Sequence, residues 1–279
     1  MKCRICDEDT EPFACISTAD LDEPFLDESL RRELPQLKLR RCPQCSCLWA
    51  DDVRQDEGIL ARAYERVSDA YFDSAENDQR YTRFYKRLEQ LVAGHVAGTT
   101  VLDVGCGDGA FLSTLSDRWL KRGLEPTASG SGLARKKNLD VSCATLDSSA
   151  RQYQANLISA LDVIEHVIDP HHFVESFKRH LRPGGVVLLL TGDAIHIRHG
   201  LLAHNGRTCV GVDTSPCSHS RVCENCWTRM ASKSSTGRAA SILRVRARWR
   251  GGACTCWSLR GLLWDEANRG IHSGATIKR

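Results

Sequence analysis

The sequence has no run of about 18 uncharged apolar residues, the length that a membrane-spanning helix requires. Its first residues, Met1-Lys2-Cys3-Arg4, contain no apolar signal-peptide core, and internal repeats are absent. We therefore expect a cytoplasmic protein with no membrane partner. In that compartment the 14 cysteines are expected to be thiols or metal ligands rather than disulfides.

The composition is that of a globular protein, with 42% hydrophobic and 26% charged residues among 279. At about 150 residues per domain, this length corresponds to one large domain or two small ones. The formal net charge of +3 conceals two regions of opposite sign. Residues 1–194 carry 24 basic and 31 acidic side chains, whereas residues 195–279 carry 14 and 4. This change predicts that the tail has a different origin or task.

Short apolar runs alternate with helical stretches between residues 99 and 193. Such alternation predicts βαβ units, and hence an α/β protein with a doubly wound, Rossmann-like, mostly parallel sheet. The expected strands are Thr100–Val104, Arg122–Glu125, Leu139–Cys143, Leu157–Asp162 and Val186–Thr191, and the expected helices between them are Gly109–Leu120, Ser131–Asn138, Ser148–Gln154 and Pro170–Leu181.

Two C-x-x-C pairs lie near the N-terminus, Cys3 with Cys6 and Cys42 with Cys45. Each pair can supply two corners of a tetrahedral zinc site, and a segment of about 50 residues with little core needs such a staple. We expect a closed, structural Cys₄ zinc site; redox-active thiols are the alternative.

An apolar strand runs directly into a glycine-rich loop that contains Gly105, Gly107 and Gly109, and a helix follows. Glycines permit sharp turns and the close approach of a ligand, while a helix N-terminus offers free N–H groups. Glu125 comes 20 residues after Gly105, where a carboxylate can accept ribose hydroxyls. The spacing also fits the dinucleotide fingerprint, but Asp103 at the mouth suits a cationic aminoacyl group better than a pyrophosphate.

The stretch from Asp103 to Gly109 resembles motif I of class I S-adenosylmethionine-dependent methyltransferases. Four later segments resemble that family in the same order, and the cysteine-rich front makes the chain similar to bacterial methyltransferases with a zinc-binding front domain, including sugar C-methyltransferases. The four segments are Gly123-Leu-Glu125-Pro126, Thr145-Leu146-Asp147, Leu161–Pro170 and Leu181–Gly185.

The resemblance implies a role for each matching residue. Asp103 and the backbone of Gly105, Cys106, Gly107 and Gly109 would hold the methionine part of the cofactor. Glu125 would bind the ribose, Leu146 and Asp147 would frame the adenine, and Asp162 would line the methyl-transfer face. Tyr71, Tyr81 and Tyr85 precede the loop; we expect core packing, with shielding of the cofactor as the alternative.

Asp162, Glu165 and His166 follow the fourth expected strand. They resemble the acidic-x-x-Glu-His cluster that binds a divalent metal in quinone O-methyltransferases, although Asp162 is one methylene shorter. A structural role, an acid–base role for His166 and Glu165, and a metal site all remain open.

The tail, residues 195–279, holds six cysteines, four tryptophans and twelve arginines but no Phe or Tyr. It shows no sustained helical stripe or strand alternation, so we expect an irregular or disordered tail. A frameshift near residue 194 of a GC-rich gene would yield this composition. The alternative is a basic module with a metal site formed by Cys217, Cys223, Cys226 and either Cys254 or Cys256; no specific nucleic-acid surface is indicated.

Four regions are therefore expected: a zinc-binding segment at 1–50, a helical connector at 51–98, an S-adenosylmethionine-binding domain at 99–193 and a basic tail at 194–279. The expected function is S-adenosylmethionine-dependent methylation of a small molecule, with a nucleotide-linked sugar as the first choice. The alternatives are a nicotinamide-dependent oxidoreductase and a cofactor-binding protein inactivated by a damaged C-terminus.

Overall fold

The fold is that of a computed structural model, which describes residues 1–20, 28–45, 47–51, 62, 72, 79–191, 241–250, 253–265 and 270–273. The chain divides into two units. One comprises Met1–Val67, Ile164–Val174 and Thr191–Ser234, and the other comprises Ser68–Val163, Glu175–Leu190 and Ser235–Arg279. Among the described helices, none has the length and apolar character needed to cross a membrane.

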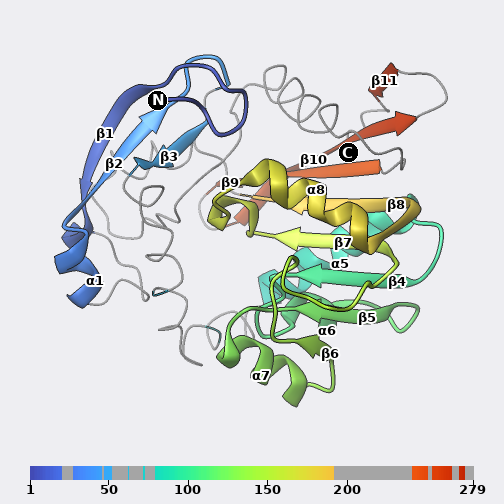
Figure 1. Ribbon diagram of the computed structural model, residues 1–279. Coiled ribbons are helices and arrows are strands. Elements are labelled where there is room, and N and C mark those ends of the chain that lie inside the picture. The colour runs from blue at the N-terminus through green and yellow to red at the C-terminus, as the bar shows by residue number, and fades with distance from the viewer. Residues whose placement is uncertain are drawn as a thin grey trace. The chain divides into compact units, whose positions relative to one another are not determined.

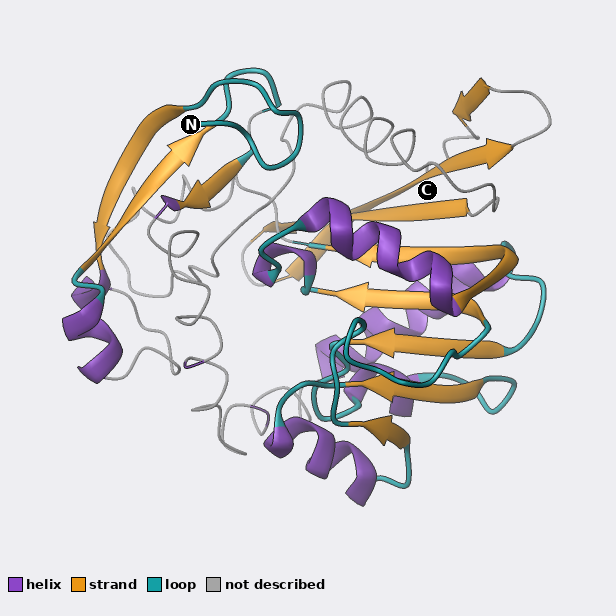
Figure 2. Cartoon of the chain, in the orientation of Figure 1, coloured by secondary structure: helices purple, strands orange, loops and turns teal. Residues whose placement is uncertain are grey.

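The first unit contains a small antiparallel sheet in the order β1-β2-β3 (Figure 2). Apolar and polar residues alternate along its central strand, where Leu37 and Leu39 are buried. Trp49 of the next strand is also buried and pairs with Arg40. The elements are β1 (Glu11–Ser17), the 3₁₀ turn η1 (Thr18–Asp20), α1 (Glu28–Glu33), β2 (Gln36–Arg41) and β3 (Leu48–Ala50).

Residues 100–190 of the second unit supply five parallel strands in the order β6-β5-β4-β7-β8 (Figure 1). The two strands next to each other at its centre, β4 and β7, are almost wholly buried. Residues 186–190 of β8 are buried as well, which explains why they form a continuous apolar run. The predicted Rossmann-like, doubly wound sheet is thereby confirmed. Its strands are β4 (Thr100–Val104), β5 (Leu120–Leu124), β6 (Asp140–Ser142), β7 (Ala155–Leu161) and β8 (Leu181–Leu190).

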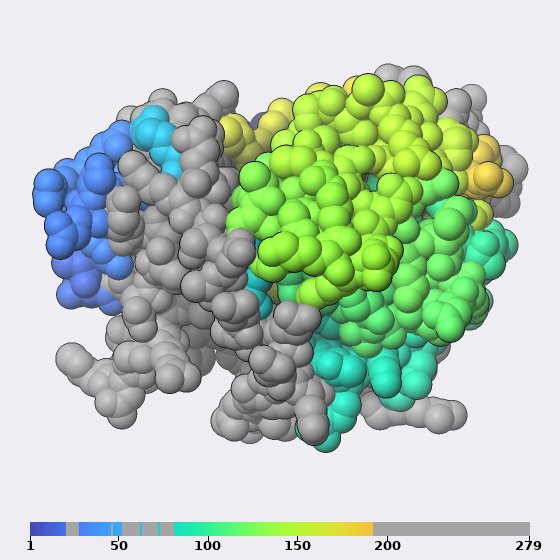
Figure 3. Space-filling model, turned by 90° about the horizontal axis from the view of Figure 1, so that it is seen from below, coloured from blue at the N-terminus to red at the C-terminus, as the bar shows by residue number. Residues whose placement is uncertain are grey.

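Helices cover both faces of this sheet, with α5 and α6 behind it and the C-terminal half of α8 in front (Figure 1). Phe84, Leu88 and Val92 form one stripe of α5, which packs in the same core as Phe111 and Leu112 of α6. The green atoms of this unit form one closely packed body (Figure 3). The helical elements are α5 (Gln79–Ala93), α6 (Ala110–Thr114), α7 (Ala128–Lys136), the 3₁₀ turn η2 (Ile164–His166) and α8 (Pro170–His180).

Two expected helices differ from the structure. No helix forms over residues 148–154, because Thr145 and Ser148 exchange side-chain hydrogen bonds with each other's backbone N–H and close a single turn. Helix α6 ends at Thr114 rather than at residue 120, where the carboxylate of Glu89 accepts hydrogen bonds from the Ser116 N–H and the Trp119 indole. Tertiary hydrogen bonds thus replace the next helical turn.

The prediction that the tail lacks strands is wrong for three segments. β9 (Ser241–Arg250) pairs parallel with β8, and β10 (Ala253–Asp265) pairs antiparallel with both β9 and β11 (Gly270–Ser273). The signal was present in the sequence, since apolar residues and arginines alternate strictly from residue 243 to residue 250. The four cysteines proposed as an alternative metal site include Cys217, Cys223 and Cys226, which lie outside the described residues.

Candidate functional site

The glycine-rich loop connects β4 to α6 at the carboxyl edge of the parallel sheet. Its glycines all have left-handed backbone conformations, with φ of +67° at Gly105, +54° at Gly107 and +80° at Gly109. A Cβ atom at Gly105 would lie 2.6 Å from Val163, and one at Gly109 would collide with Leu139. Packing therefore requires glycine at these two positions, whereas the surroundings of Gly107 are more open.

An aromatic ring lies beside Gly107 that the sequence analysis did not single out. A Cβ atom at Gly107 would be 3.2 Å from Cε1 of Phe72, and one at Gly130 would be 2.9 Å from its Cζ. Among the tyrosines considered, Tyr85 packs edge-on against Phe111 at 5.4 Å, and Tyr81 is 39% exposed. Tyr71 lies outside the described residues. Periodicity alone does not distinguish Phe72 from its neighbours, so this ring had no signal in the sequence.

Glu125 follows β5 directly, and its side chain is buried. One carboxylate oxygen, Oε2, accepts a hydrogen bond from the Gly107 N–H at 2.9 Å. The other, Oε1, accepts from the N–H and the hydroxyl of Thr127, at 2.9 and 2.6 Å. The carboxylate thus joins the glycine loop to the N-terminus of α7. A carboxylate offers about four acceptor positions, so Oε2 retains one for a ligand hydroxyl.

Replacing Glu125 with alanine should lower the affinity for S-adenosylhomocysteine about 10–100-fold, because charge-assisted hydrogen bonds contribute about 1.5–3 kcal/mol. Isothermal titration calorimetry measures this affinity directly. Asp140→Ala serves as the matched control, since that carboxylate is half exposed on the neighbouring strand β6. Equal affinities for the two variants would mean that the ribose does not lie at Glu125.

Asp103 lies on β4, almost completely buried, and its Oδ1 accepts a hydrogen bond from the Ser159 hydroxyl on β7 at 2.6 Å. Burial raises the pKa of Asp103 to about 7, and the nearby Glu125 carboxylate adds to the increase. A buried carboxyl group with one neutral partner is suited to an incoming cation, which would favour its ionised form.

The affinity for S-adenosylhomocysteine should therefore increase with pH through about 7, because only the ionised Asp103 attracts the ligand ammonium group. Below that pH the affinity should fall by up to about tenfold per pH unit. Calorimetry between pH 5.5 and 8.5 measures the profile. Asp103→Asn should bind more weakly and without this dependence; an unchanged slope in that variant would assign the titration to another group.

The backbone of Cys106 is predicted to contact the cofactor, and the Cys106 thiol is buried. A Cβ atom at Gly123 would lie 2.6 Å from its Sγ, and burial raises the pKa of the thiol. Asp108 anchors the loop from the other side, through a 2.8 Å ion pair with Lys137 after α7. The contact between the Cys106 backbone and the cofactor remains a prediction.

Leu146 and Asp147 contact α8. Leu146 is buried and its carbonyl accepts a hydrogen bond from His180, while the Asp147 carboxylate accepts one from Ser176 at 2.6 Å and pairs with Arg179. These contacts give both residues a packing role, and the adenine contact remains a prediction.

The acidic cluster after β7 begins with Asp162, which has a left-handed φ of +53° and donates its N–H to the Leu190 carbonyl. Glu165 is buried and accepts a hydrogen bond from the Thr191 hydroxyl at 2.9 Å. Burial lowers the pKa of His166, so the imidazole is neutral near pH 7. Within the described part of the chain, the metal-binding geometry found among His, Cys, Asp and Glu side chains is that of the N-terminal cysteines and does not include this cluster.

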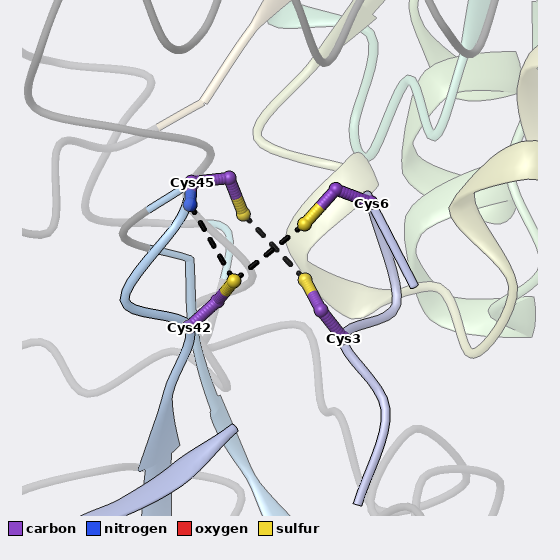
Figure 4. Close-up of side chains that lie close together, drawn as sticks. All are labelled: Cys3, Cys6, Cys42 and Cys45. Carbon is purple, nitrogen blue, oxygen red and sulfur yellow. Dashed lines mark hydrogen bonds between the residues drawn. The ribbon is translucent and has the colours of Figure 1, made fainter. Parts of the chain in front are cut away.

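Those cysteines, Cys3, Cys6, Cys42 and Cys45, come together from two distant segments, with their sulfurs facing one another (Figure 4). The four Sγ atoms lie within 4.8 Å of one another, and two cross-segment pairs are 3.5 Å apart. Tetrahedral zinc with Zn–S bonds of about 2.3 Å would place sulfurs about 3.8 Å apart. The set therefore fits a closed tetrahedral site.

Backbone groups support the thiols as ligands. The Ile5 N–H donates to Cys3 Sγ and the Cys45 N–H donates to Cys42 Sγ, both at 3.4 Å. Contact with Cys45 raises the pKa of Cys3 to about 11, so a cation is needed to keep these thiols ionised together. Cys15 is exposed, whereas Cys47 is fully buried beside the cluster.

Residues 74–206 match a family model described as a methyltransferase domain. A ubiquinone biosynthesis O-methyltransferase of Neisseria meningitidis serogroup A is 23% identical over 149 residues, which are 49% of this chain and 62% of that protein. The corresponding protein of Pseudomonas paraeruginosa is 34% identical over 105 residues, 34% of this chain and 45% of that protein. The chain thus spans about half the length of these curated relatives.

Among solved structures, the plantazolicin methyltransferase BpumL in complex with SAH is similar, with a TM-score of 0.46 and 16% identity over 71% of this chain and 75% of that one. The family match covers α5, the glycine loop, Glu125 and the acidic cluster, in the order that the sequence motifs predicted. The similarity to known methyltransferases thus lies in residues 74–206, the region whose motifs resemble the class I S-adenosylmethionine-dependent methyltransferases.

Proposed function

We propose that this protein transfers a methyl group from S-adenosylmethionine to a small-molecule acceptor. The observation that carries the proposal is the hydrogen bond from the Gly107 N–H to the Glu125 carboxylate at the carboxyl edge of the sheet. It places a carboxylate with a remaining acceptor position beside a backbone site that lacks a side chain. Ligands of open α/β sheets bind at this edge.

The described residues fit S-adenosylmethionine better than a dinucleotide. Two buried carboxylates, Asp103 and Glu125, flank the loop; a pyrophosphate would meet repulsion there, whereas an ammonium group and ribose hydroxyls would be stabilised. In this proposal Asp103 and the loop backbone hold the aminoacyl part, and Glu125 holds the ribose. Once bound, the cofactor supplies an electrophilic methyl group on a sulfonium centre.

The chain's own residues then have to orient the acceptor and move a proton. Methyl transfer depends mainly on alignment, and a base is needed only when the acceptor is a hydroxyl or an acidic C–H group. A neutral His166 can take that proton, with Glu165 fixing the end of β8 through Thr191. We assign His166 as the base and Glu165 as its positioning neighbour.

Two acceptor classes follow from different observations. A nucleotide-linked sugar is our first choice, because a cysteine-rich segment precedes the methyltransferase domain, as in the sugar C-methyltransferases that the chain resembles. A phenolic hydroxyl is the second, because several curated relatives are ubiquinone biosynthesis O-methyltransferases. A neutral imidazole suits either acceptor.

The test has two stages. Calorimetry with S-adenosylhomocysteine and, separately, with NAD shows which cofactor binds; binding of NAD alone would overturn the proposal. Transfer of labelled methyl groups to panels of nucleotide sugars and of dihydroxybenzoates then distinguishes the acceptors. His166→Gln should lower kcat about 10²–10⁴-fold at unchanged cofactor affinity if it is the base.

The cysteine cluster is proposed as a structural zinc site, formed by Cys3, Cys6, Cys42 and Cys45. The thiols are all buried and use four coordination positions, so no open position remains for chemistry. Thiolates of this kind persist in a reducing compartment, so we place the protein in the cytosol.

The region 194–279 is proposed to be a frameshifted tail, so the substrate pocket would be incomplete and the chain would bind the cofactor but turn over slowly or not at all. Resequencing the gene around codon 194 tests the frameshift. Deleting 194–279 tests its role: cofactor affinity should change little if the tail is foreign, whereas a collapse of affinity would show that cofactor binding depends on β9–β11, which extend the sheet beside β8.

A further inference from the structure

One residue of α8 contacts the cysteine-rich segment. Nε2 of His171, in the first turn of the helix, lies 3.0 Å from the carbonyl oxygen of Ile5. Ile5 lies between Cys3 and Cys6 and is 2% exposed. Because a carbonyl oxygen only accepts, His171 must donate through Nε2–H.

The position of the Ile5 carbonyl depends on the cysteine cluster. The Ile5 N–H is directed to Cys3 Sγ, and the following residue, Cys6, places its Sγ 3.5 Å from that of Cys42. Both peptide groups of Ile5 are therefore constrained by sulfur atoms. A metal ion that fixes the four sulfurs would also fix the acceptor of the His171 hydrogen bond.

The other partner, His171, stands five residues after His166 and six after Glu165. The segment Ile164–Val174, which carries all three, belongs to the same compact unit as residues 1–67. The helix turn is fixed locally as well, because Asp169 accepts hydrogen bonds from the N–H groups of His172 and Phe173. Forming or breaking the hydrogen bond of His171 is therefore expected to change the order of the short segment that carries Glu165 and His166.

We propose that His171 is a positioning residue that links the cysteine cluster to the segment carrying Glu165 and His166. Metal occupancy of the cluster then sets the order of residues 164–174, whereas the glycine loop and Glu125, which belong to the other compact unit, are independent of it. This inference rests on the proposed methyltransferase function for its kinetic readout alone. Its structural readout does not depend on any activity.

The experiment uses the full chain with its metal and three variants: His171→Ala, His171→Gln and, as the matched control, the exposed neighbour His172→Ala. Hydrogen–deuterium exchange of peptides covering residues 164–174 measures the order of the segment. His171→Ala should raise exchange in these peptides about 5–10-fold, as expected for the loss of one hydrogen bond. Glutamine, whose Nε2–H can donate to the same carbonyl, should restore protection, and His172→Ala should change nothing.

Removing the metal from the wild-type protein with a chelator should raise exchange over 164–174 to the same extent, and removing it from His171→Ala should add little. Kinetically, His171→Ala should lower kcat for methyl transfer about 5–10-fold at unchanged S-adenosylhomocysteine affinity. The inference would be overturned if neither His171→Ala nor metal removal changes the rate of hydrogen–deuterium exchange in residues 164–174. If His171→Ala does not fold, the inference is tested by the exchange protection of His171→Gln and by metal removal from the wild-type protein. Absence of cofactor binding by the wild type would instead refute the proposed function.

Discussion

Gly107→Val is expected to abolish measurable binding of S-adenosylhomocysteine, a loss of more than about 100-fold. Gly107 has a φ of +54°, a region that costs a β-branched residue well over about 1 kcal/mol. A Cβ atom there would also lie 3.2 Å from Phe72, and the two methyl groups of valine would need further space in a loop whose Gly107 N–H donates to the Glu125 carboxylate. The same substitution thus distorts the loop and occupies the ligand's place.

Calorimetry measures the affinity, and circular dichroism verifies that the variant is folded. Gly94→Val is the matched control, because Gly94 follows α5 and a Cβ atom there meets nothing within 4 Å. Gly107→Ala should fall between the wild type and valine, since it carries the backbone strain with only one added carbon. Wild-type affinity in Gly107→Val would show that the cofactor binds elsewhere in the chain.

The sheet could be predicted from sequence because its signals are local. An apolar run bounded by glycines predicts a buried strand, and β4 has the expected bounds, Thr100–Val104. Glu125 could be placed at a strand end for the same reason. The pairing of the two C-x-x-C motifs was predictable because the spacing of thiols within each motif is specific to metal binding.

Other features depend on contacts between segments far apart in the chain. The end of α6 is set by Glu89, which is 27 residues from Ser116, and the packing role of Asp147 is set by Ser176, 29 residues away. Phe72 approaches Gly107 and Gly130 from a segment before the sheet begins. No local pattern encodes such pairings, because they result from how the helices pack on the sheet.

Strand β9 could have been predicted from the alternation of apolar residues and arginines between residues 243 and 250. Its pattern of arginines and apolar residues is local and regular, although the composition of residues 195–279 as a whole is not typical of a folded domain. Composition describes a region as a whole, whereas a strand requires only a few residues of period two. A strand can therefore form within a tail of unusual composition.

Cys42→Ser should remove the bound zinc and unfold the front segment. Cys42 is completely buried, and its N–H donates to the Cys47 carbonyl at 2.9 Å, so it anchors the connection between β2 and β3. Structural zinc contributes about 10–16 kcal/mol in zinc-finger peptides, more than the net stability of many domains, about 5–15 kcal/mol. Elemental analysis should fall from one zinc per chain to none, and limited proteolysis should cleave within residues 1–50.

Cys15→Ser provides the matched control, because that cysteine is exposed on the same small sheet and its Sγ contacts only Gln36 among the hydrogen-bonding partners described. This variant should retain one zinc per chain and resist the protease as the wild type does. Affinity for S-adenosylhomocysteine should stay within about twofold in Cys42→Ser, since Gly107 and Glu125 belong to a unit with its own core. Wild-type protein purified without chelator that holds no zinc would refute the metal site. A Cys42→Ser protein that loses cofactor affinity together with its zinc would show instead that the cluster supports the whole chain.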